Sequence, residues 1–166
     1  MKPHIEILAR GVCVKDGKIL LCHSRRTRHT YLPGGHVEFR EGARASLVRE
    51  VAEELGLASE AGRFLGAAEH TFRQRGERHC EINLVFELTI PGLAAARPPP
   101  SEEAYLDFRW VRIDALRRST LEPFVLRRQL AAWLDPASRA ERWSTTYKEK
   151  CGARNAERGI ADAERD

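Results

Sequence analysis

The segment Gly35–Leu57 constrains the fold of this chain more than any other part of the sequence. Within Gly42–Leu55, apolar residues recur at three- and four-residue spacing, which predicts an amphipathic helix with one face on the protein core. Glu50, Glu53 and Glu54 fall at positions i, i+3 and i+4, so we expect their carboxylates to share the opposite face. The residues of the predicted apolar face are Ala45, Val48, Val51, Ala52 and Leu55.

The three glutamates predict a site for a hard divalent cation. Like charges about 6 Å apart in an effective dielectric of about 20 repel by about 3 kcal/mol per pair, and a bound cation reverses the sign. Ligands that are all oxygen favour Mg²⁺ or Mn²⁺, whereas Zn²⁺ would be expected with histidine or cysteine. The alternative is an ordinary acidic helix face that is covered by water.

Three more residues of the segment have expected roles. Gly56 is placed to end the helix, because a residue without Cβ readily adopts the left-handed conformation found there. Arg49 can hold a glutamate through a bidentate contact that lysine cannot reproduce. Glu41 lies near the helix start, where the dipole favours negative charge, and both a capping role and a metal role stay open for it.

The segment resembles the Nudix box, G-x5-E-x7-R-E-U-x-E-E-x-G-U, in which U is a bulky aliphatic residue. Its seven non-aliphatic positions would coincide by chance on the order of 10⁻⁹ per starting point at average residue usage. The resemblance therefore identifies the chain as a member of the Nudix hydrolase family. All nine fixed positions are met, by Gly35, Glu41, Arg49, Glu50, Val51, Glu53, Glu54, Gly56 and Leu57.

The resemblance implies an activity and a set of site residues. Nudix enzymes use water and a divalent metal to cut a phosphoanhydride bond in a nucleoside diphosphate linked to another group. By analogy, Glu50, Glu53 and Glu54 are the expected ligands of Mg²⁺, with Mn²⁺ as an alternative, and Arg49 is expected at the catalytic centre. The main-chain carbonyl of Gly35, or that of the residue before it, resembles a further metal ligand of the family.

The residue that takes the proton from water varies across the family. It is sometimes a glutamate of the box and sometimes a carboxylate on a later loop. Glu102 and Glu103 lie on such a loop, and we choose Glu103 as the expected base by a narrow margin. Ordinary solvated glutamates are an equal alternative, because exposure is the norm for this residue type.

Four residues outside the box are expected to bind the substrate. Arg25 and Arg26 precede the box and Arg78 opens a later strand, where arginine can pair with phosphate oxygens. Solvated surface positions are the more common situation for such arginines. Phe72 could stack on a nucleobase, although packing in the protein explains an aromatic residue equally well.

Strand patterns on both sides of the box predict the rest of the fold. Residues 5–14 and 18–22 form an expected hairpin around Asp16-Gly17, and residues 63–72, 80–90 and 106–111 also have strand character. A second helix is expected over residues 123–134. We therefore predict the α/β class and a Nudix fold, an α/β/α sandwich with a mixed β-sheet between helices. The domain should span residues 1–136, followed by a polar extension, 137–166, that is partly helical or disordered.

Composition limits the class of protein. Hydrophobic residues make up 42% and charged residues 31%, which suits a soluble globular domain, and no apolar run approaches the ~18 residues of a membrane span. The first residues lack the apolar segment of a signal peptide, so we expect a cytoplasmic protein without a membrane partner. Four scattered cysteines show no zinc-ligand or disulfide spacing. A homodimer is suggested by the family alone.

The substrate is expected to be a small nucleotide, first a nucleoside triphosphate. The proline that ADP-ribose hydrolases of the family carry about fifteen residues after the box is missing, as is the tyrosine of dinucleoside polyphosphate hydrolases. Leu121 stands where oxidised-purine triphosphatases often have asparagine. The alternatives are hydrolysis of RNA 5′ ends, suggested by the net charge of +4, and a module that senses nucleotides without cutting them.

Overall fold

The computed structural model of the protein describes residues 4–74 and 76–147, and its strands form two four-stranded sheets. The first sheet has the order β1-β6-β5-β8, with β1 (Glu6–Val12), β5 (Glu60–Gln74), β6 (Glu77–Thr89) and β8 (Trp143–Thr145). β1 pairs with β6 and β8 with β5 in parallel, whereas β5 and β6 are antiparallel. The predicted mixed sheet is therefore confirmed.

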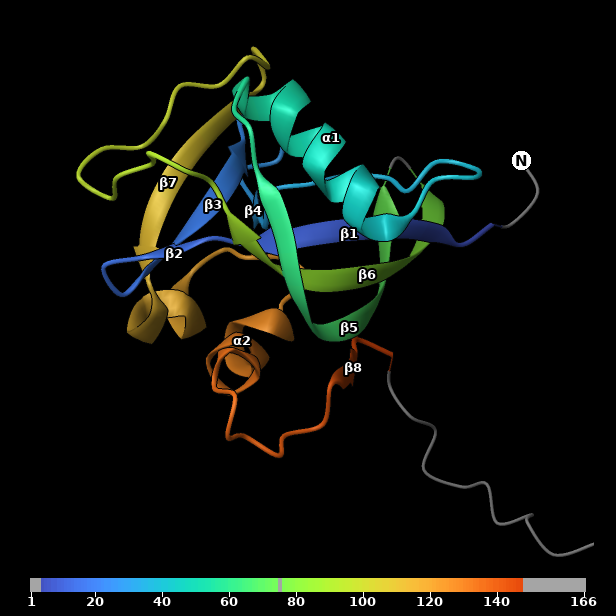
Figure 1. Ribbon diagram of the computed structural model, residues 1–166. Coiled ribbons are helices and arrows are strands. Elements are labelled where there is room, and N and C mark those ends of the chain that lie inside the picture. The colour runs from blue at the N-terminus through green and yellow to red at the C-terminus, as the bar shows by residue number, and fades with distance from the viewer. Residues whose placement is uncertain (1–3, 75, 148–166) are drawn as a thin grey trace, which may run out of the picture.

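The second sheet is antiparallel and lies beside the first (Figure 1). In it β3 (Lys18–Ser24) pairs with β2 (Val14–Lys15), β4 (Thr30–Tyr31) and β7 (Leu106–Arg112). The strand predicted over residues 5–14 is interrupted at Cys13, because its two parts belong to different sheets. Asp16 and Gly17 have φ of 49° and 69°, which is the backbone required by the predicted tight turn.

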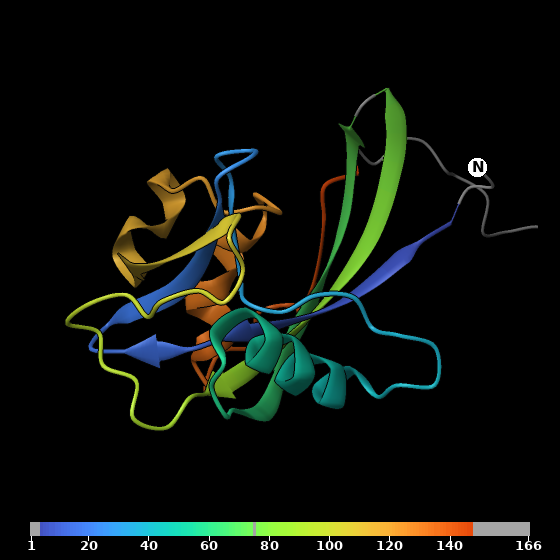
Figure 2. The ribbon, with the colours of Figure 1, turned by 90° about the horizontal axis from the view of Figure 1, so that it is seen from above.

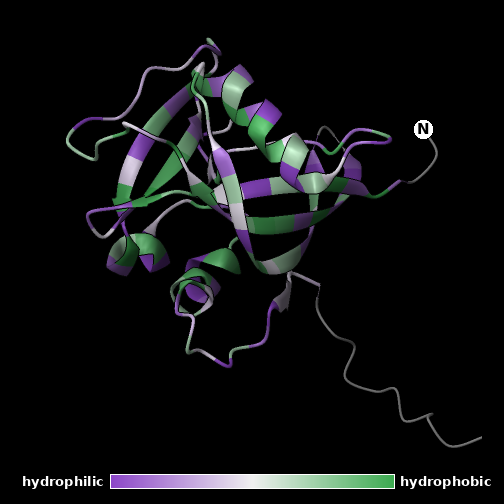
Figure 3. Cartoon of the chain, viewed as in Figure 1, coloured by the Kyte–Doolittle hydropathy of each residue, from purple (hydrophilic) through white to green (hydrophobic). Residues whose placement is uncertain are grey.

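Helices cover the two sides of this strand assembly, as the predicted sandwich requires (Figures 1 and 2). α1 (Ala43–Leu55) packs over β1 and β5, and α2 (Leu126–Leu134) lies on the opposite side next to the 3₁₀ helix η1 (Ile113–Arg118). Each helix closes its own cluster of buried apolar residues. In Figure 3 hydrophobic and hydrophilic bands alternate along the strands and along both helices.

The predicted apolar face of α1 is partly wrong. Ala45 and Ala52 are exposed, and the buried apolar positions are Leu47, Val51 and Leu55, spaced by four residues. The helix is rotated toward its larger side chains because burying leucine removes more apolar surface from water than burying alanine. As a result, the glutamates are not all on the outer face: Glu54 is 9% exposed.

Gly56 ends α1, as predicted from the sequence. Gly56 has φ of 64° and its backbone N–H donates to the carbonyl of Ala52 at 2.8 Å. An L side chain at this φ would be strained, so glycine suits this position.

The beginning of the predicted extension is part of the folded structure. The backbone N–H of Ala67 in β5 donates to the carbonyl of Arg142 at 2.7 Å, and β8 continues this pairing. The indole N–H of Trp133 donates to the carbonyl of Glu141 at 2.8 Å. The extension therefore adds a strand, and no helix, over residues 137–147. The rest of the extension that was predicted to be partly helical or disordered, residues 148–166, lies outside the described residues, and the boundary at residue 136 stays a prediction.

The helices bear on whether the chain can cross a membrane. None of those in residues 4–74 and 76–147 is both long enough and apolar enough to cross a bilayer.

Candidate active site

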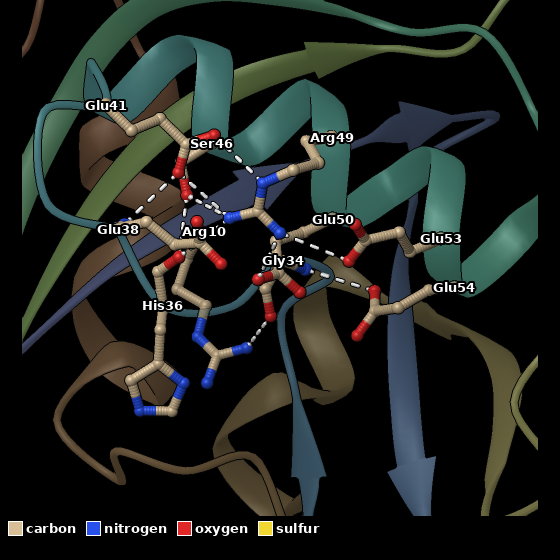
Figure 4. Close-up of polar contacts among 10 residues, drawn as sticks. All are labelled: Arg10, Gly34, His36, Glu38, Glu41, Ser46, Arg49, Glu50, Glu53 and Glu54. Atoms are coloured by element: carbon tan, nitrogen blue, oxygen red, sulfur yellow. Dashed lines mark hydrogen bonds and ion pairs between the residues drawn. The ribbon is translucent and has the colours of Figure 1, made fainter.

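Arg49 organises the polar face of α1 (Figure 4). Its guanidinium donates to both oxygens of Glu41 at 2.9 Å, which is the bidentate contact expected from the sequence. The same side chain donates to Glu50 at 3.0 Å and to Glu53 at 3.1 Å. Arg49 thus holds three of the box carboxylates in one network.

This network also explains Glu41. The guanidinium of Arg49 lowers the pKa of Glu41 to about 2, so the carboxylate stays ionised. The N-cap of α1 is Gly42 and has no side-chain capping bond, so the capping role considered for Glu41 is absent. Glu41 binds Arg49, and a metal role for Glu41 stays a prediction.

Glu54 is the buried carboxylate of the box. It accepts a hydrogen bond from the backbone N–H of Gly34 at 3.2 Å. Burial raises the pKa of Glu54 to about 7, while the charge of Arg10 and the bond from Gly34 act in the opposite direction. A carboxylate in this setting gains strongly from a nearby cation, because ionisation without one is costly.

The donors present fit a hard divalent cation in chemistry but are not yet gathered around one point. Among residues 4–74 and 76–147, no group of three acidic, histidine or cysteine side chains is close enough to hold an ion as it stands. Glu50 and Glu53 are both turned toward Arg49. The carbonyl of Gly35 accepts from the N–H of Ala9 at 2.9 Å. The roles of Gly35, Glu50, Glu53 and Glu54 as metal ligands stay predictions.

Gly35 is fitted closely to Glu50, and this leads to a test. A Cβ at Gly35 would overlap the carboxylate of Glu50, whereas a Cβ at Gly42 would meet nothing within 4 Å. We expect Gly35→Ala to turn Glu50 away and to weaken Mn²⁺ binding about tenfold in a calorimetric titration, the size of effect seen when a metal ligand loses its orientation. Gly42→Ala is the matched control and should bind Mn²⁺ like the wild type. Unchanged affinity in Gly35→Ala would contradict a metal role for Glu50.

A cavity of about 920 Å³ opens beside these carboxylates. Its volume is at the upper end for sites that hold small ligands, about 300–1,000 Å³. Glu50, Glu54 and the two glycines before α1 form one part of its wall, and the rest includes arginine, histidine and aromatic residues, two further glutamates, and several small polar and apolar residues. The site can therefore place a charged, ring-containing ligand against the box.

Two of the predicted substrate-binding residues, Arg26 and Phe72, line this cavity. The guanidinium of Arg26 lies 5.0 Å from the centre of the Tyr105 ring. Phe72 stacks on His70 and on His79, with ring centroids 5.1 and 5.0 Å away. The packing role considered for Phe72 is therefore present, and its contact with a nucleobase stays a prediction.

The other two arginines lie elsewhere. Arg25 forms an exposed ion pair with Asp107, with 2.6 Å between Nη2 and Oδ1, and does not line the cavity. Arg78 is exposed on the β5–β6 hairpin and lines a smaller hollow together with Tyr147. The structure does not bring either residue to the carboxylates of the box.

Glu103, the expected base, is half-buried on the loop before β7. Its neighbour Glu102 donates its backbone N–H to the carbonyl of Glu54 at 2.9 Å, which ties this loop to the end of α1. The charge of Glu103 contributes to the raised pKa of Glu54. The loop is therefore attached to the end of α1, although Glu103 does not line the cavity beside Glu50 and Glu54, and its role as the base stays a prediction.

Arg10 was missed in the sequence, although it lines the cavity. It lies on β1 and donates to the carbonyl oxygens of Gly34 and Leu32, the latter at 3.2 Å. The available signal was a charged residue inside an otherwise apolar strand, where a half-buried arginine usually has a specific partner.

Residues 4–134 match the sequence model of the NUDIX domain. The chain belongs to the Nudix family. A curated relative, the ADP-ribose pyrophosphatase of Methanocaldococcus jannaschii, is 34% identical over 94 residues, which are 54% of this chain and 53% of the relative. This Nudix protein thus matches about half the length of that relative.

Solved structures confirm the Nudix fold. The solution structure of the E. coli ORF135 protein aligns with a TM-score of 0.59 at 22% identity and covers 81% of this chain and 95% of that chain. The crystal structure of the MutT NUDIX hydrolase from Burkholderia pseudomallei aligns with a TM-score of 0.54 at 25% identity and covers 68% of this chain and 86% of that chain. The predicted family and fold are therefore both correct.

Proposed function

We propose that this Nudix protein is a divalent-metal-dependent pyrophosphohydrolase, which cuts a phosphoanhydride bond in a nucleoside diphosphate linked to another group. The observation that carries the proposal is the position of Glu50 and Glu54 in the wall of a cavity that also contains Arg10 and Arg26. Carboxylates suit a hard cation and arginines suit phosphate oxygens. One cavity therefore offers partners for both halves of a metal–nucleotide complex.

Glu50, Glu53 and Glu54 would hold Mg²⁺ or Mn²⁺, with a carbonyl of the glycine pair as a further donor. The bound ion neutralises charge on the phosphate oxygens and makes the phosphorus easier to attack. Arg49 orients Glu50 and Glu53 through its two contacts of 3.0 and 3.1 Å. Because the guanidinium keeps its charge, Arg49 can hold both carboxylates as ion-pair partners.

Glu103 is the proposed general base. A water oxygen forms a bond to phosphorus, the bridging P–O bond breaks, and the water proton goes to the Glu103 carboxylate. The phosphate that leaves takes the electron pair of the broken bond. The support for this choice is the attachment of the Glu102–Glu103 loop to the end of α1 through the carbonyl of Glu54.

Nucleoside triphosphates and ADP-ribose are the two substrates that we favour. The triphosphate follows from the run Leu32-Pro33-Gly34-Gly35, which resembles family members that act on nucleoside triphosphates. ADP-ribose is suggested by the Methanocaldococcus jannaschii relative, an ADP-ribose pyrophosphatase of which this chain matches about half the length. The missing proline after the box still argues against ADP-ribose.

A hydrolysis screen tests the proposal. It would compare nucleoside triphosphates, ADP-ribose, nucleotide sugars, coenzyme A and diadenosine polyphosphates, each with Mg²⁺, with Mn²⁺ and with EDTA. We expect metal-dependent release of a nucleoside monophosphate from at least one of the first two, and no release with EDTA. No turnover across the panel would contradict an enzyme and favour a module that senses nucleotides.

A further inference from the structure

Arg10 is an arginine of the cavity whose position is fixed by uncharged acceptors. Its guanidinium donates to the carbonyls of Leu32 and Gly34, and its Nε donates to the side-chain oxygen of Asn83 at 3.4 Å. Asn83 is 1% exposed, so this end of the network is rigid. Figure 4 shows the guanidinium extending toward Gly34, next to the carboxylates of α1.

Arg142 also donates to backbone carbonyls, but it does not line the cavity, and three further arginines have charged partners. Arg25, Arg49 and Arg127 each pair with a carboxylate, at 2.6, 2.9 and 2.7 Å. Arg10, by contrast, donates its hydrogen bonds to neutral oxygens, lies 5.9 Å from the centre of the Tyr31 ring and lines the cavity, where the carboxylate of Glu54 is close enough to feel its charge. A guanidinium in this situation gains most from an anion, because hydrogen bonds between charged groups are about twice as strong as neutral ones.

We propose that Arg10 binds a phosphate oxygen of the substrate, and that it releases the Gly34 carbonyl when the glutamates of α1 hold a divalent cation. The inference rests on the proposed function. Glu54 accepts from the N–H of Gly34, and Arg10 donates to the carbonyl of the same residue. A cation held by Glu54 would therefore lie close to the guanidinium of Arg10. The two cations repel, and a phosphate that binds both removes the repulsion.

A purely structural role makes a different prediction. If Arg10 only clamps the loop before α1, its loss would loosen Gly34 and Gly35 and would weaken the binding of metal and nucleotide together. If Arg10 repels the cation and then binds phosphate, its loss should strengthen the binding of metal and weaken the binding of nucleotide. The sign of the change in metal affinity therefore separates the two roles.

The experiment compares Arg10→Gln and Arg10→Lys with Arg112→Gln. Arg112 is the control, since it is an exposed arginine that pairs with Asp114 and does not line the cavity. Calorimetry measures Mn²⁺ binding to each protein without nucleotide, and then the binding of α,β-methylene-ATP at saturating Mg²⁺. Thermal unfolding of each variant is measured to establish whether it keeps the fold.

We expect Arg10→Gln to bind Mn²⁺ about fivefold more tightly, since one nearby positive charge is gone. It should bind α,β-methylene-ATP about ten- to hundredfold more weakly, the cost of a lost hydrogen bond between charged groups. Arg10→Lys should bind Mn²⁺ within about twofold of the wild type and the nucleotide with intermediate affinity. Lysine keeps the positive charge but lacks the planar guanidinium that can donate two parallel hydrogen bonds. Arg112→Gln should match the wild type in both titrations.

Two results would overturn the assignment of Arg10 alone, in a wild type that hydrolyses a substrate of the screen. One is unchanged nucleotide affinity in Arg10→Gln, and the other is a parallel loss of metal and nucleotide affinity, which assigns Arg10 to the loop. A wild type that turns over nothing in the screen would instead overturn the proposed function, and the inference with it.

Discussion

The double replacement Glu53→Gln, Glu54→Gln is expected to reduce Mg²⁺-dependent hydrolysis at least about a thousandfold. Glutamine is a poor ligand for a hard cation, and loss of the ion removes several kcal/mol of charge stabilisation from the transition state. The fold should remain, because glutamine at position 54 can still accept the hydrogen bond from Gly34, and Glu53 is exposed. The measurement is kcat/KM on the best substrate of the screen.

A matched control removes two charges elsewhere. Glu60 and Glu77 are exposed at the starts of β5 and β6, away from the cavity lining. The control Glu60→Gln, Glu77→Gln should keep wild-type kcat/KM within about twofold, as expected for surface positions without a specific partner. Turnover of the Glu53, Glu54 double variant at the control's rate would refute the proposed metal site.

The box and its physical basis could be predicted from the sequence because their determinants are local. Helix periodicity, a glycine at the helix end and an Asp-Gly turn depend on neighbours within a few residues. The structure confirms α1, the left-handed Gly56 and the hairpin at Asp16-Gly17. The bidentate contact of Arg49 was also predictable, although its partner Glu41 was not singled out for it.

The features that were not predicted depend on contacts between distant segments. The rotation of α1 that buries Glu54 follows from how Leu47 and Val51 pack on the strands. Arg10 reaches the site because β1 runs beside the loop that carries Gly34, 24 positions later in the chain. β8 joins the first sheet through Ala67, far away in sequence. Such choices are set by tertiary packing, which a local pattern does not contain.

The burial of Glu54, the proposed cation ligand, should destabilise the metal-free protein at high pH. Burial raises the pKa of Glu54 to about 7 in the folded protein, against 4.5 for a glutamate side chain in water. A carboxyl group with a raised folded pKa holds its proton more tightly in the folded state, so its contribution to stability is complete below pH 4.5 and is lost as pH rises through 7. The loss between pH 5 and pH 8 is about 2–3 kcal/mol.

The comparison with Glu54→Gln isolates this effect. His70, whose pKa is lowered by burial, works in the opposite direction at acid pH and is present in both proteins, so it cancels in the difference. With EDTA, urea unfolding at pH 5 and pH 8 should show the variant gaining about 2–3 kcal/mol over the wild type as pH rises. A difference independent of pH would contradict a buried, protonatable Glu54. Addition of Mg²⁺ at pH 8 should restore stability to the wild type only, because an ion that binds the folded carboxylates opposes unfolding.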